Sequence, residues 1–126
     1  MSVENKKFVT KLLPDGIVHT QVQEGADISF DDAKINTQDV IALTAGKPRP
    51  LLVDTRLIAS ISKAARDHFS MRERKPNVNS IAILIQSPLS RIIGNFFMGL
   101  NKPTVPTKLF TDQRTAIAWL KTFLNN

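Results

Sequence analysis

Few residues in this 126-residue chain have types and spacings that could do chemistry. Asp54 is the one acidic residue that directly ends a strongly apolar run, and no second carboxylate lies near it in the sequence to form an acid/base pair. The two histidines, His19 and His68, stand apart without the local pattern of a metal site. The chain has no cysteine, which excludes disulfides, thiol catalysis and cysteine-based metal sites. We therefore predict a protein that is not an enzyme and uses no metal or cofactor.

Asp54 and three serines, Ser60, Ser62 and Ser87, are candidate regulatory or anion-binding residues. Ligands of open parallel sheets bind beyond the carboxyl ends of the strands, where helix N-termini present unsatisfied amides. Ser62 and Ser87 each precede a predicted helix, the latter in a Ser-Pro pair typical of a helix start. The alternative is that these serines only cap their own helices. Asp54 would then bind amides of its own loop or pair with Arg56.

An unusually apolar segment predicts a helix from Pro88 to about Leu100, with Arg91 as its only clear charge. One interpretation places this helix mainly in the core. The other extends its apolar side into a dimer interface or onto an apolar ligand. The candidate interface residues are Ile93, Phe96, Phe97, Met98 and Leu100.

The elements that position these residues follow from hydrophobic periodicity and turn signals. Strands are predicted at residues 7–12, 17–23, 51–53, 81–85 and 105–110, and helices at residues 29–45, 63–69, 88–100 and 112–124. The first two strands form a hairpin around a Pro-Asp-Gly turn. The order β-β-α-β-α-β-α-β-α predicts one α/β domain over residues 1–126, a mixed sheet of about five strands flanked by four helices and parallel over its later strands.

Finer expectations concern positions within these elements. Residues 81–85 are the most strand-like and are expected at the centre of the sheet, whereas Pro106 argues for an edge strand. Ser29 or Asp31 is expected to cap the first helix. Its buried face is expected to include Ala33, Val40 and Ile41, and Thr111 is expected to cap the last helix.

The charge pattern bears on partners and location. The chain has 17 lysines and arginines against 11 acidic residues, a net charge of +6, but the basic residues are scattered. No aromatic residues interleave with the basic cluster at residues 72–75, as binding of single-stranded nucleic acid would require, so we expect no nucleic-acid partner. No apolar stretch is long enough to span a bilayer, and the first residues hold no apolar signal-peptide core. These features predict a cytoplasmic protein.

Several stretches of the chain resemble the SpoIIAA-like proteins, small relatives of the STAS domain, some of which have a SEC14-like character. The stretches are Leu-Leu-Val-Asp at 51–54, Ile-Ser-Lys-Ala-Ala-Arg at 61–66, Ser-Pro-Leu-Ser-Arg-Ile-Ile-Gly-Asn-Phe-Phe at 87–97, and residues 106–120. The resemblance implies the same sheet with four helices and, commonly, a homodimer. STAS anti-sigma-factor antagonists are phosphorylated on a serine of an Asp-Ser pair at the start of the helix after the central strand. Ser62 and Lys63 stand at that place here, so the pair is absent.

The resemblance and the missing catalytic set together suggest a non-enzymatic regulatory or protein-interaction module that forms a homodimer and contacts a protein partner. The alternative is a small carrier for a lipid or another apolar ligand, as the SEC14-like character implies.

Overall fold

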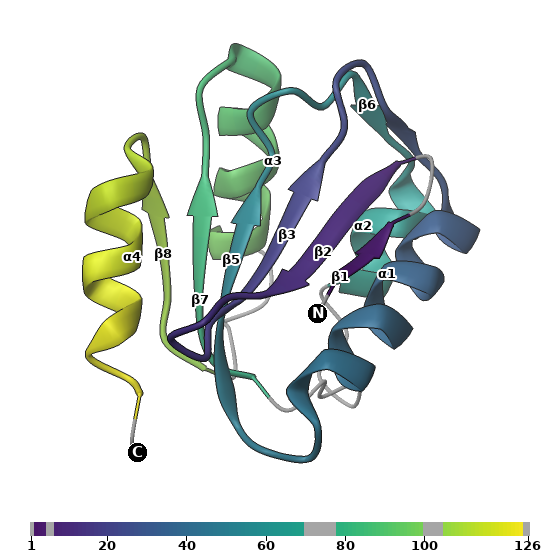
Figure 1. Cartoon of the computed structure of the whole chain (residues 1–126). Coiled ribbons are helices and arrows are strands. Elements are labelled where there is room, and N and C mark those ends of the chain that lie inside the picture. Colours follow the sequence, from purple (N-terminus) through teal and green to yellow (C-terminus); the bar gives the residue numbers. More distant parts are fainter. Residues whose placement is uncertain (1, 5–6, 70–77, 100–104, 125–126) are drawn as a thin grey trace.

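The computed structural model describes residues 2–4, 7–69, 78–99 and 105–124, with the backbone alone for residues 2–4 and 96–99. Its centre is a six-stranded mixed sheet in the order β1-β2-β3-β5-β7-β8 (Figure 1). The strands are β1 (Ser2–Glu4), β2 (Phe8–Leu12), β3 (Val18–Val22), β5 (Arg49–Asp54), β7 (Val78–Leu84) and β8 (Thr107–Phe110). β1, β2 and β3 pair antiparallel, whereas β3, β5, β7 and β8 run parallel. The predicted mixed α/β sheet is confirmed, and β1 adds a strand to the five expected.

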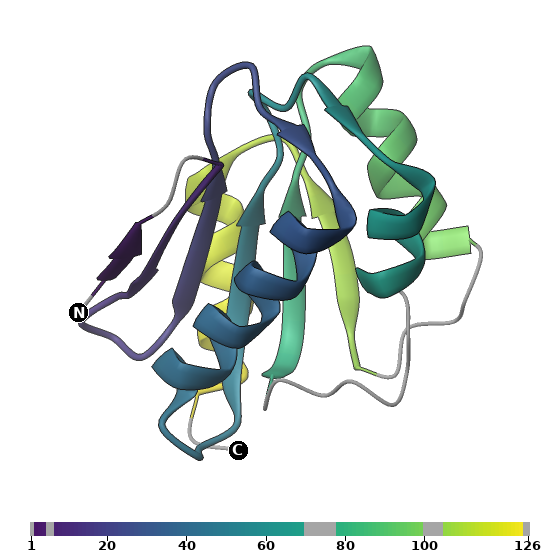
Figure 2. The same ribbon diagram turned by 90° about the vertical axis from the view of Figure 1, so that its right-hand side faces the viewer.

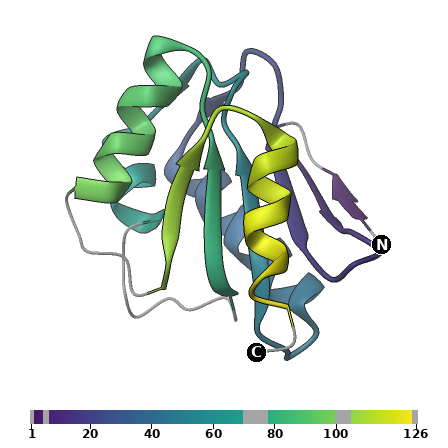
Figure 3. The ribbon, with the colours of Figure 1, turned by 90° about the vertical axis from the view of Figure 1, so that its left-hand side faces the viewer.

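Four helices flank the sheet, as predicted: α1 (Phe30–Thr44), α2 (Lys63–Phe69), α3 (Pro88–Gly99) and α4 (Gln113–Lys121). Helices α1, α2 and α3 lie on one face, and α4 lies on the other (Figures 2 and 3). A short parallel ribbon of β4 (Asp27–Ile28) and β6 (Ser60–Ile61) leads the chain into α1 and α2. The parallel strands follow one another in one direction, from β3 to β8, so right-handed crossovers place α1, α2 and α3 on the same face. The helix α4 follows the last strand and is not part of a crossover.

The position of β7 corrects one prediction. β3 and β5 occupy the middle of the sheet, whereas β7 lies second from the edge, since β8 alone follows it. The apolar run of β7 reflects burial on both faces, with Ala82 and Leu84 under α4 and Ile81 against the cluster under α1. Burial on both faces does not require a central position. The edge position argued from Pro106 is confirmed, because β8 is the last strand of the described sheet, next to β7.

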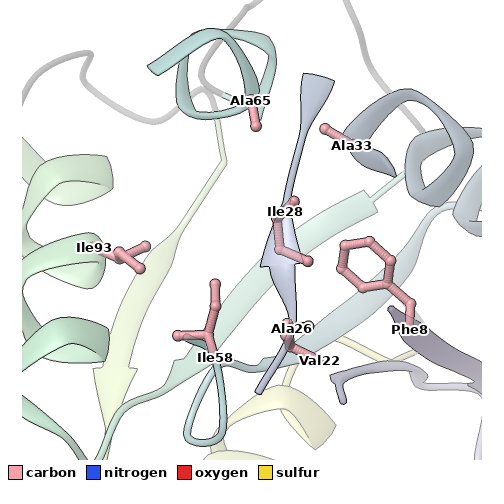
Figure 4. Close-up of a cluster of buried hydrophobic side chains, with 8 residues drawn as sticks. All are labelled: Phe8, Val22, Ala26, Ile28, Ala33, Ile58, Ala65 and Ile93. Atoms are coloured by element: carbon pink, nitrogen blue, oxygen red, sulfur yellow. The ribbon is translucent and has the colours of Figure 1, made fainter. Parts of the chain in front are cut away.

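Alternate residues of the strands build separate cores on the two faces. Ile17, Leu52, Ala82 and Leu84 face α4 and pack against its Ala116 and Leu120. Under α1 lie Val18 and Leu51 with Val40 and Leu43. A third cluster joins α1, α2 and α3 around Ile28 of β4 (Figure 4); its members are Phe8, Val22, Ala26, Ile28, Ala33, Ile58, Ala65 and Ile93.

Local signals in the sequence predicted most helix ends correctly. Ser29 caps α1 in a reciprocal capping box with Asp32, and the residue after the helix, Ala45, is left-handed with φ 53°. Ile41 was expected in the buried face but is 45% exposed, because the buried stripe instead runs through Asn36. At α4 the cap is Asp112, not Thr111, and its carboxylate accepts the Thr115 amide at 3.1 Å.

Candidate functional site

Asp54 ends β5 with its side chain almost fully buried, and its partner is Arg56. The guanidinium of Arg56 donates from Nε to Asp54 Oδ1 at 3.0 Å and from Nη2 to Oδ2 at 2.8 Å. The Arg56 amide also donates to Oδ1 at 3.0 Å. This is the bidentate geometry of a strong arginine–carboxylate pair. The structural alternative for Asp54, a loop-amide contact and a pair with Arg56, is therefore what the geometry supports.

The side chain of Arg56 hydrogen-bonds to two residues, Asp54 and Gln113. Besides its two bonds to Asp54, its Nη2 lies 3.4 Å from Oε1 of Gln113, the first residue of α4. The bonds to the Asp54 carboxylate raise the pKa of Arg56, outweighing the opposite effect of its burial, and the charge of Asp112 adds to the rise. Arg56 thus ties the end of β5 to the start of α4. The sequence pointed to the Asp54–Arg56 pair, but Gln113 is 57 residues from Arg56 and gave no local signal.

Ser87 caps α3 as one member of a mutual serine pair. The Ser90 amide donates to Ser87 Oγ at 3.0 Å, while Ser90 Oγ accepts the amides of Gln86 and Ser87 at 2.8 and 2.9 Å. Ser90 is fully buried, so its hydroxyl occupies the place where an anion would meet those two amides. Sequence reasoning missed Ser90, although the Ser-x-x-Ser spacing at a helix start was a usable signal.

Ser60 and Ser62 lie at β6 and at the start of α2. The Ser60 hydroxyl donates to the Asp27 carboxylate across the small ribbon. Ser62 is exposed, and its Oγ accepts the Ala65 amide at 3.1 Å as the cap of α2. Asp54 ends β5, and Ser87 follows β7, the parallel strand next to it. Ser60 and Ser62 do not lie at the ends of these two strands. A regulatory role for Ser60 or Ser62 stays a prediction.

The apolar helix α3 presents apolar residues both inward and outward. Ile93 is 2% exposed and belongs to the core cluster, whereas its neighbour Ile92 is 66% exposed. A Cβ on Gly94 would lie 2.9 Å from Leu109 Cδ2 and 3.1 Å from Ile85 Cγ2, so α3 packs directly on the sheet there. The side chains of Phe96, Phe97 and Met98 lie outside the described residues, as does the whole of Leu100.

The histidines occupy different surroundings. His68 is buried under α1, where its Nε2 lies 2.9 Å from Thr37 Oγ1. His19 lies on the other sheet face, and burial lowers its pKa; the charge of Asp54 opposes this effect, and those of Lys11 and Arg56 add to it. Within the described ranges, no three histidine or carboxylate groups gather in a way that could hold a metal ion. None of the helices in that part of the chain is long and apolar enough to cross a membrane.

Comparison with known proteins places this geometry in a fold family. The fold is shared with an uncharacterised protein of the DUF3478 family from Shewanella loihica PV-4, described as having a SpoIIAA-like fold. The TM-score is 0.68 at 20% identity, over 95% of this chain and 98% of that one. An anti-sigma factor antagonist from Mycobacterium paratuberculosis gives a TM-score of 0.63 at 18% identity, over 90% and 92% of the two chains. The predicted SpoIIAA-like fold is thereby confirmed.

Sequence comparison adds a family and no characterised relative. Residues 11–124 match the model of a domain of unknown function, DUF7793. No curated protein matches the chain. A protein of unknown function from Arthrobacter sp. FB24 is 33% identical over 94% of this chain and 95% of its own, with a TM-score of 0.36.

Proposed function

The chain belongs to the DUF7793 family, a domain of unknown function, and we propose that it is a non-enzymatic protein-interaction module that self-associates through α3. A protein-binding role is supported by the likeness of its fold to that of an anti-sigma factor antagonist. It is also supported by the state of Asp54, whose carboxylate is engaged by Arg56 and so is not available as an acid or base.

The observation that carries the proposal is the exposure of Ile92 on the outward side of α3. Ile92, at 66% exposure, is the most exposed of the large apolar side chains described, while Ile93 and Gly94 on the same turn seal the helix onto the sheet. Because the inward side of α3 already packs against the core, Ile92 on its outward side is available to contact the surface of another protein. Burial of such a side chain on association is favourable by about 1.5–3 kcal/mol.

The alternative of a carrier for a lipid or another apolar ligand gains less support. A ligand seated between α3 and the sheet would need space where Gly94 approaches Leu109 and Ile85. That contact is so close that even one added methyl group would have to displace a neighbour. We therefore propose protein contact as the use of α3.

Sedimentation velocity over a concentration series tests self-association. We expect the wild-type chain to sediment as a dimer and Ile92→Glu to sediment as a monomer, because a carboxylate cannot be buried unpaired in an apolar interface. The matched control is Ile41→Glu, which places the same charge at an exposed isoleucine of α1 and should leave the dimer intact. A monomeric wild-type chain, or a dimer that survives Ile92→Glu, would contradict the proposal.

A further inference from the structure

The strand β8 forms the outer border of the described sheet. It is the last strand in the sheet order, next to β7, and Figure 3 shows it with α3 on one side and α4 on the other. Each of its four residues is at least partly exposed, whereas β5 and β7 contain runs of buried residues. The border of the sheet at β8 is therefore accessible from outside.

The pairing with β7 fixes which backbone groups of β8 point outward. The Ile85 amide donates to the Phe110 carbonyl at 2.9 Å, so the backbone groups of Phe110 point toward β7. Successive residues of a strand direct these groups to opposite sides, and Thr107 and Leu109 therefore direct theirs away from β7. The outward amides and carbonyls of these two residues have no hydrogen-bond partner in the part of the chain that the structure describes.

An aromatic cluster lies beside this border on the α4 face. Phe110 of β8 contacts Trp119 of α4 with ring centroids 5.6 Å apart, and Trp119 contacts Phe123 with centroids 4.9 Å apart. All three side chains are partly exposed. Aromatic side chains are enriched in protein interfaces, so these rings suit contact with an apolar side chain of a partner.

Lys108 adds a charge to the same row of side chains. Its Nζ lies 5.6 Å from the centre of the Phe110 ring, and it forms no salt bridge with the described residues. The nearest acidic residue along the chain is Asp112, whose carboxylate already caps α4. A carboxylate of a partner, placed two residues from an apolar side chain, would complement both Lys108 and Phe110.

An extended peptide segment fits this combination of groups. The outward backbone groups of Thr107 and Leu109 repeat every second residue, about 7 Å, which is the repeat of another strand. An antiparallel segment would place one side chain opposite Phe110 and the side chain two residues later opposite Lys108. A partner segment is favoured over a second copy of this strand, because β8 itself contains a lysine and no acidic residue.

We call Thr107, Lys108, Leu109, Phe110 and Trp119 the β8 edge. We propose that the β8 edge binds an extended segment of a partner protein, which pairs antiparallel with β8. An apolar side chain of that segment contacts Phe110 and Trp119, and a carboxylate two residues later binds Lys108. This surface does not include Ile92, so the proposal goes beyond self-association through α3 and is tested separately from it.

A synthetic, acetylated peptide with the sequence Ser-Val-Phe-Thr-Glu-Val-Ser tests the assignment. It is titrated into the isotopically labelled full chain by NMR, and binding is also followed by the fluorescence of Trp119, the only tryptophan of the chain. We expect chemical-shift changes centred on residues 107–110 and a change in indole emission.

Two N-methylated peptides separate strand pairing from unspecific attraction. N-methylation of the central threonine, whose amide would face Leu109, should weaken binding roughly tenfold or more, because it removes a ladder hydrogen bond and blocks close approach. N-methylation of the glutamate, whose amide would point away from β8, should change the affinity by less than about twofold.

Variants of the chain test the same contacts from the other side. Thr107→Pro removes an outward amide that β7 does not use, and should weaken binding roughly fivefold or more. The matched control Thr107→Ala keeps that amide and should bind the peptide as the wild-type chain does. Lys108→Glu should weaken binding of this peptide and strengthen binding of a peptide with lysine in place of the glutamate.

Equal binding of the two N-methylated peptides would show that no strand is added and would overturn the proposal. The absence of shifts at residues 107–110 would also overturn it. So would a dimer that persists in Ile92→Glu and is lost on adding Thr107→Pro, because a second copy of the chain would then occupy the β8 edge. Binding of the peptide by monomeric Ile92→Glu with wild-type affinity would support the proposal independently of α3.

Discussion

β2 and β3 carry polar side chains on both faces, yet the two faces are used in opposite ways. Thr10 and Thr20 form a directly opposed pair under α1 and are fully buried. Lys11 and His19, the next pair along, lie on the face that no described helix covers at these strands. The same two strands thus supply a polar core contact on one side and a surface on the other.

The buried pair is tolerated because a third residue completes its hydrogen bonding. Thr10 Oγ1 lies 3.2 Å from Thr20 Oγ1, and Asn36 of α1 donates its Nδ2 to them at 3.2 and 3.4 Å. A polar group under a helix is costly unless it is bonded in this way. On the uncovered face Lys11 is exposed to water, whereas the Nε2 atom of His19 is buried and has no hydrogen-bond partner among the described residues. Coverage by a helix, and not residue type, therefore decides the role of a polar side chain in this sheet.

The largest expected effect concerns α4, the one described helix on the less covered face. Leu120→Ala should lower the free energy of unfolding by about 3 kcal/mol, because Leu120 is fully buried and anchors α4 on Leu52 and Leu84. Urea denaturation measures this change. Lys121→Ala, at the next, exposed position, should change stability by less than about 0.5 kcal/mol. A small effect of Leu120→Ala would mean that α4 contributes little to this face.

A smaller loss of stability is expected from a change at Arg56, which lies just after the end of β5. Arg56→Met should cost about 2 kcal/mol, because it leaves the Asp54 carboxylate buried without its ion pair. The value is below that of a fully buried pair because 28% of the Arg56 side chain remains exposed. Adding Asp54→Asn to Arg56→Met should recover part of the loss in the same denaturation assay. If the double variant were no more stable than Arg56→Met, the pair would not be the cause.

The smallest expected effect is the contribution of His19 to the pH dependence of the free energy of unfolding. Burial lowers the pKa of His19, so the folded chain binds a proton there more weakly than the unfolded chain. The free energy of unfolding should therefore fall as the pH drops below about 6.5, the pKa of an unperturbed histidine. His19→Gln should remove this contribution, seen as a shallower loss of stability between pH 7.5 and pH 5. An unchanged slope would show that His19 is not desolvated in the folded chain.

Local interactions let much of the architecture be predicted from the sequence alone. The hairpin, the order of the main strands and helices, and the caps at Ser29 and Ser87 depend on neighbours within a few residues, and all were predicted. The pairing of Asp54 with Arg56 was among the alternatives for the same reason, because the two residues are only two positions apart in the sequence. The resemblance to SpoIIAA-like proteins supplied the fold family.

Contacts between distant segments decided the rest. In β2 the alternation of Phe8, Thr10 and Leu12 with two lysines indicates the buried face, but it could not show how the buried Thr10 hydroxyl is satisfied. That depends on Asn36 of α1, which is 26 residues away. Likewise, Ile92 and Ile93 are identical side chains, and only the close approach of α3 to β7 and β8 turned one inward and the other outward. Composition and periodicity thus determined which elements form, whereas the docking of helices on the sheet determined which of their side chains remain available for a partner.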